Sequence, residues 1–83
     1  MTSSVSHLND TDRKFSEELL KAVIKFQNAD WGDTCKEDCE MNDQALQNGD
    51  DHIVAKYKTT NGDIFIITEH DRSATTILFA HEY

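Results

Sequence analysis

The sequence of 83 residues contains no proline, three glycines and two cysteines, and it has no long apolar run. No segment approaches the roughly 18 apolar residues that are needed to cross a bilayer. Residues 1–10 also lack the basic start and the apolar centre of a secretory signal. With 37% apolar residues, a chain this short can build one small core. We therefore expect a single soluble domain over residues 1–83, located in the cytoplasm, with residues 1–9 as a loose polar lead-in.

Basic residues are scarce: eight Lys and Arg stand against 16 Asp and Glu, which gives a net charge of −8. This balance disfavours direct binding of nucleic acid, because neutralising phosphates requires Lys and Arg. Residues 30–51 hold eight of the acidic residues and one base, Lys36. Such a segment is either a solvated helix face that keeps the protein soluble or an acidic surface that docks a basic protein. For the docking interpretation we select Asp38, Glu40 and Asp43 as the partner-binding residues.

Two helices are expected in the first half of the chain. Apolar residues at helical spacing predict an amphipathic helix from about residue 11 to residue 28. A second helix is expected from about residue 35 to residue 48. Thr34 and Glu37 match a capping box at its start, and Gly49 follows its last residue.

Three strands are expected in the second half. Segments 52–58, 63–68 and 75–81 are rich in branched and aromatic residues, and Asn61-Gly62 between the first two is a strong hairpin signal. The sequence therefore predicts an α+β domain, in which two helices are followed by a three-stranded antiparallel meander and pack on one of its faces.

The two cysteines, Cys35 and Cys39, lie one helical turn apart and share a face of the expected second helix. A structural disulfide is not expected in a reducing cytosol, which leaves a metal site or the packing of two small apolar side chains. Zinc takes thiolate and imidazole ligands in a tetrahedral arrangement. The meander returns His81, at the end of the third strand, towards the start of this helix. We therefore predict a structural Zn²⁺ held by Cys35, Cys39 and His81, with the fourth ligand left open, and we expect His52 and His70 at the opposite end.

No pattern of an enzyme stands out. A cysteine nucleophile needs a histidine base and an oxyanion site, and the sequence shows no nucleophile elbow, phosphate loop or paired-carboxylate geometry. Residues 69–71, Glu-His-Asp, are interpreted as a polar turn, and Trp31 as a core anchor beside a turn. We expect a small acidic binding protein that is not an enzyme, with a thiol-dependent or metal-dependent enzyme as a weaker alternative.

Residues 29–83 resemble a family of small proteins from bacterial mobile elements and prophages. The shared sequence motifs are DWGD, the pairs ND and AL within the expected second helix, IITE, DRS, TTIL and a final EY. Within it, the chain is similar to type II-A anti-CRISPR proteins, which block the RNA-guided DNA-cleaving nuclease. The resemblance implies a phage-type inhibitor that acts in the host bacterial cytoplasm, binds the nuclease stoichiometrically through an acidic surface and prevents target-DNA loading. The alternative is an accessory or regulatory protein of a mobile element that binds another basic protein. The cysteine pair is not one of the shared sequence motifs.

Overall fold

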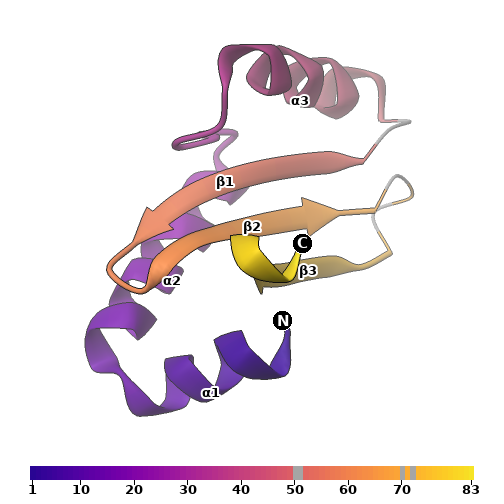
Figure 1. The fold of residues 1–83 in the computed structure, drawn as a ribbon. Helices are drawn as coiled ribbons and strands as arrows, with labels where there is room; N and C mark the ends of the chain where they lie inside the picture. The colour runs from indigo at the N-terminus through magenta and orange to yellow at the C-terminus, as the bar shows by residue number, and fades with distance from the viewer. Residues whose placement is uncertain (50–51, 70, 72) are drawn as a thin grey trace.

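The structure is a computed structural model, and it describes residues 1–49, 52–69, 71 and 73–83. Helices precede strands along the chain, and the elements follow one another as drawn in Figure 1. They are α1 (Ser3–Thr11), α2 (Arg13–Gln27), α3 (Lys36–Asn48), β1 (Ile53–Thr59), β2 (Gly62–Thr68), β3 (Thr75–Phe79) and a short 3₁₀ helix, η1 (Ala80–Glu82). This order confirms the predicted α+β class. In the described part of the chain, no helix is both long enough and apolar enough to cross a membrane.

The amino-terminal segment is a helix, so the expectation of a loose lead-in over residues 1–9 is wrong. Thr2 caps α1, because its side-chain oxygen accepts a hydrogen bond from the backbone N–H of Val5. Val5 is completely buried in the core. Asp12 then ends α1 and caps α2, accepting hydrogen bonds from the backbone N–H groups of Lys14 and Phe15. Residues 3–11 are thus ordered by the burial of Val5, by capping at Thr2 and Asp12, and by packing against α2 and β3.

The sheet has the strand order β1-β2-β3, and both pairs are antiparallel. Its hairpin turn is the predicted one, with Thr59 opposite Gly62. Alternate residues point to opposite faces of a strand, and α1 and α2 cover one face, which holds the core (Figure 1). The buried apolar residues of the core are Val5, Phe15, Leu19, Ala22, Trp31, Ala45, Ile53, Ala55, Tyr57, Ile64, Ile66 and Phe79.

Helix α3 lies along the outer edge of β1, whereas α1 and α2 cover the face of the sheet (Figure 1). Side chains before and within α3 pair with the backbone of this edge strand. Asn42 donates through Nδ2 to the carbonyl of Val54 at 2.7 Å and accepts from the N–H of Val54 at 3.1 Å. The hydroxyl of Thr34 accepts from the N–H of Lys56 at 2.8 Å. An edge strand exposes unpaired backbone groups, and these contacts satisfy three such groups of β1, at Val54 and Lys56, while fixing the position of α3.

Candidate protein-binding site

The three carboxylates predicted to bind a partner are all exposed on α3, but they differ in what they contact. Oδ1 of Asp43 accepts a hydrogen bond from Nε1 of Trp31 at 2.8 Å. Trp31 is buried in the core, as the sequence predicted. A buried indole N–H needs such a partner. Asp43 therefore helps to hold the loop before α3, whereas the side chains of Asp38 and Glu40 make no such hydrogen bond within the described residues.

Most acidic side chains of the described chain make internal contacts. Asp12 caps α2, Asp33 accepts from the N–H of Lys58 at 3.1 Å, and Glu18 accepts from the N–H of Thr60 at 3.1 Å. Within the described residues, three carboxylates of α3 make no hydrogen bond or ion pair through their side chains: Glu37, Asp38 and Glu40. The first two lie in the first turn, where negative charge is favoured by the helix dipole. The fold therefore leaves a group of free carboxylates on α3.

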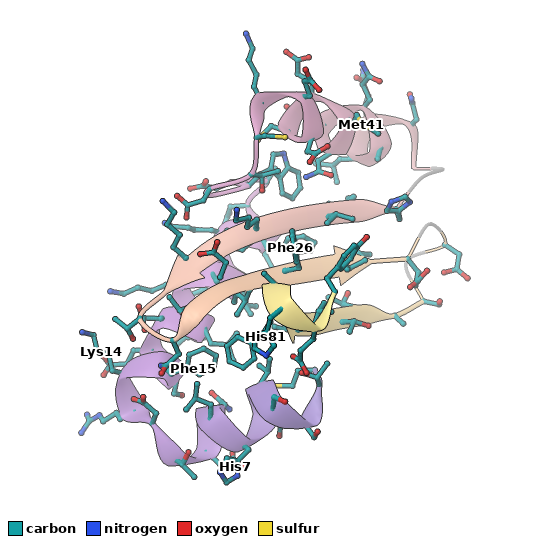
Figure 2. All side chains as sticks on the ribbon, viewed as in Figure 1. His7, Lys14, Phe15, Phe26, Met41 and His81 are labelled. Carbon is teal, nitrogen blue, oxygen red and sulfur yellow. The ribbon has the colours of Figure 1, made fainter. Side chains whose placement is uncertain are left out.

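Asp38 lies where two surface hollows meet. One hollow has a volume of about 210 Å³ and is lined by Asp38, Met41, Asn42, His52, Val54 and Tyr83. The other has a volume of about 270 Å³ and is lined by Asp33, Thr34, Cys35, Asp38, Val54, Lys56 and Phe65. Because both contain Asp38 and Val54, we treat them as one depression, the front groove. It runs between α3, where Figure 2 labels Met41, and the sheet face opposite α1 and α2.

The floor of the front groove contains two apolar side chains, Val54 and Phe65, beside that of Lys56. Val54 and Phe65 alternate with core residues along their strands, so they point away from α1 and α2, and both are half-buried. The ring of Tyr83 lies against that of Phe65, with 5.1 Å between the centroids, and 75% of Tyr83 is exposed. The groove thus combines apolar side chains on its floor, an exposed aromatic ring and the free carboxylate of Asp38.

The position of Tyr83 depends on η1, which turns the chain back across β2 after β3 ends (Figure 1). Glu82 anchors this turn: Oε1 accepts hydrogen bonds from the N–H of Phe79 and the hydroxyl of Thr2, both at 2.9 Å. The hydrogen bond from Phe79 is the main cause of a lowered pKa of Glu82. The carboxylate is therefore charged at neutral pH, and it ties the wall of the groove to the start of α1.

The partner-binding residues predicted from the sequence do not include Val54, Phe65 or Tyr83. A signal for Phe65 was present in residues 64–67, Ile-Phe-Ile-Ile, which are apolar without alternation. Such a run indicates a strand with apolar side chains on both faces. On the second face of β2, η1 packs against only part of the strand.

Cys35 and Cys39 lie at the start of α3. Cys35 is the exposed N-cap residue and makes no side-chain capping bond. Thr34 does not form the predicted capping box, because its hydroxyl donates to the carbonyl of Trp31 and accepts from Lys56. Cys39 is half-buried against the core and its thiol donates to the carbonyl of Thr34 at 3.4 Å. Burial, followed by the nearby charge of Asp43, raises the pKa of Cys39, which favours the neutral thiol.

His81 lies on η1, so its expected place at the end of the third strand is wrong. Its ring stacks on that of Phe79, with 5.4 Å between the centroids, near the middle of the view in Figure 2. Helix α3 packs on β1, and β3 is the opposite edge of the sheet. Across residues 1–49, 52–69, 71 and 73–83, no three His, Cys, Asp or Glu side chains gather in a group that could hold a metal ion. His52 lines the front groove, and the expectation for His70 lies outside the described residues.

Zinc binding by Cys35, Cys39 and His81 stays a prediction, and elemental analysis of protein purified without chelators checks it. The thiol pair predicts about one zinc per chain, released by Cys39→Ser together with a drop in melting temperature. The position of His81 next to Phe79 makes His81→Ala the informative control. Zinc that persists in His81→Ala would assign the metal to the thiols alone, and metal-free protein of unchanged stability would leave the cysteines as packing residues.

Comparisons with protein-family models, with curated proteins and with solved structures found no match to this chain.

Proposed function

We propose that this protein is an anti-CRISPR inhibitor that binds the type II RNA-guided DNA nuclease and blocks the loading of target DNA. The observation that carries the proposal is the group of free carboxylates on α3, Glu37, Asp38 and Glu40, beside the front groove. An RNA-guided nuclease holds its nucleic acids in positively charged channels. A domain with a net charge of −8 can compete with DNA for such a surface. The resemblance of residues 29–83 to type II-A anti-CRISPR proteins selects this nuclease among basic partners.

The exposure of the groove favours a protein partner over a small-molecule substrate. Its lining residues Asp38, Met41, His52 and Tyr83 are all exposed, whereas ligand pockets usually enclose most of their ligand. Each hollow has room for one or two side chains of a partner. Binding by α3 and the groove would then act by occupancy, with one inhibitor per nuclease and no turnover. Long-range attraction between the acidic inhibitor and the basic channel would speed the encounter.

The test is a DNA-cleavage assay with purified, guide-loaded nuclease, combined with a gel-shift assay for target-DNA binding. We expect both cleavage and DNA binding to fall in proportion to added protein and to vanish near one inhibitor per nuclease. Inhibitor added after the DNA should have little effect, because the channel is then occupied. Full cleavage at excess protein would reject the proposal.

The second candidate is an accessory or regulatory protein of a mobile element that uses the same carboxylates on another basic protein. The resemblance to mobile-element proteins supports it equally. Affinity purification from the bacterial host separates the two: recovery of the nuclease supports the inhibitor, and recovery of a basic transfer or replication protein without the nuclease supports the accessory role.

A further inference from the structure

We propose that the front groove binds an arginine side chain, together with an adjacent apolar side chain, from a basic segment of the protein partner. The inference rests on the proposed function and goes further by naming the contacted surface and the chemistry that it recognises. Its basis is the juxtaposition of Asp38, Tyr83, Phe65 and Val54, which three separate parts of the fold bring together.

The apolar part of the groove accounts for the adjacent apolar side chain. Val54 and Phe65 form its floor, and Met41, of which 59% is exposed, lies on the α3 side. Burying such surface against a partner is favourable in proportion to its area. The volume of each hollow limits the insertion to individual side chains. The groove therefore fits a protruding segment of a partner better than a flat surface.

The polar part of the groove favours arginine over lysine. A guanidinium group is planar, stacks on aromatic rings and can form two parallel hydrogen bonds to one carboxylate. The exposed ring of Tyr83 and the unpaired carboxylate of Asp38 line the same hollow and supply both kinds of contact. A lysine ammonium is a compact, strongly hydrated charge that can use the carboxylate but gains less from the ring.

Charge decides what kind of molecule occupies the groove. A second copy of this chain would bring a further net charge of −8 to an acidic rim, and a nucleic acid would bring phosphates. Both are repelled. Lys56, which also lines the groove, is already paired, with its Nζ 3.4 Å from Oδ2 of Asp63. Asp38 therefore stays available for a cation, and a basic protein segment is the occupant that complements the groove.

The experiment compares two octapeptides by nuclear magnetic resonance titration of the isotope-labelled protein at low salt. One peptide alternates leucine with arginine and the other alternates leucine with lysine, so length and charge are equal. We expect the arginine peptide to shift the backbone signals of Val54, Phe65 and Tyr83 and to bind about threefold or more tightly than the lysine peptide. Tyr83→Ala should abolish the difference, whereas Tyr83→Phe, which keeps the ring, should preserve it. Equal affinities, or shifts confined to Glu37 and Glu40, would overturn the inference.

A second arm separates this inference from the proposed function. We expect Tyr83→Ala to weaken inhibition of the guide-loaded nuclease by about tenfold, with Tyr83→Phe close to the parent. If the parent inhibits and Tyr83→Ala inhibits equally well, the groove inference is overturned and the proposed function stands. If the arginine peptide binds in the groove but the parent does not inhibit, the proposed function fails and the groove inference holds for another basic partner.

Discussion

Reversing the charge of two α3 carboxylates, in the double variant Asp38→Lys and Glu40→Lys, is expected to weaken binding to the nuclease by about a hundredfold at low salt. Both side chains are exposed, and neither makes a hydrogen bond or ion pair within the described residues. The variant therefore loses attraction to a basic surface and gains repulsion without breaking an internal contact. Most of the loss should appear in the association rate, which long-range electrostatics controls, and added salt should shrink the difference.

The matched control changes the net charge by the same amount on the other side of the molecule, with Asp10→Lys and Glu17→Lys. Asp10 is exposed on α1, and Glu17 pairs with Arg13 in a largely exposed i, i+4 contact at 3.6 Å. Surface plasmon resonance on immobilised guide-loaded nuclease measures all three proteins. If the control variant loses as much affinity as the α3 variant, then overall charge, and not α3, governs binding.

Asp43 is left out of this variant for a structural reason. Its carboxylate accepts from the buried Trp31, and a lysine there would leave the indole N–H without its partner. A triple reversal that included Asp43 would mix loss of binding with loss of stability.

Truncating a buried amide, in Asn42→Ala, is expected to lower the free energy of unfolding by about 2 to 4 kcal/mol. Asn42 is 4% exposed, and its side chain pairs with both backbone groups of Val54. Alanine leaves that N–H and that C=O unsatisfied at the edge of β1. For a domain of this size, the change corresponds to a decrease in melting temperature of about 10 °C or more.

Circular dichroism during thermal unfolding measures this effect, with Gln44→Ala as the control. Gln44 lies between the buried residues Asn42 and Ala45 but is itself exposed, and its replacement should change stability by less than about 0.5 kcal/mol. An Asn42→Ala protein that melts with the control would mean that other contacts hold α3 on β1. Because α3 forms one wall of the front groove, a loosened α3 should also weaken partner binding.

The hairpin and the end of α3 could be predicted because their signals are local. Asn61-Gly62 marks the turn between β1 and β2, and Gly49 adopts the left-handed backbone, with φ at 73°, that closes α3. Helix α1 was not predicted, because its order comes from a polar cap at Thr2 and from one buried residue, Val5, in a segment without apolar periodicity. Its stability is supplied by α2 and β3, which are distant in sequence.

In the candidate site, too, features with a local sequence signal could be predicted, and features set by contacts between distant residues could not. Counting charges located the acidic segment, but the sequence could not separate Asp43, which the core uses, from Asp38, which it leaves free. The place of α3 at the edge of the sheet depends on a buried polar residue, Asn42, which a search for apolar periodicity passes over. His81 follows a run of strand-forming residues, yet Glu82 binds back to Phe79 and ends the strand before it.

The most direct test of the account is a calorimetric titration of the protein into guide-loaded nuclease, with and without target DNA already bound. We predict one inhibitor per nuclease in the absence of DNA and no measurable binding once the DNA occupies its channel. Equal binding to the free and the DNA-occupied nuclease would contradict competition for the DNA surface, and no binding to either would contradict the proposed function itself.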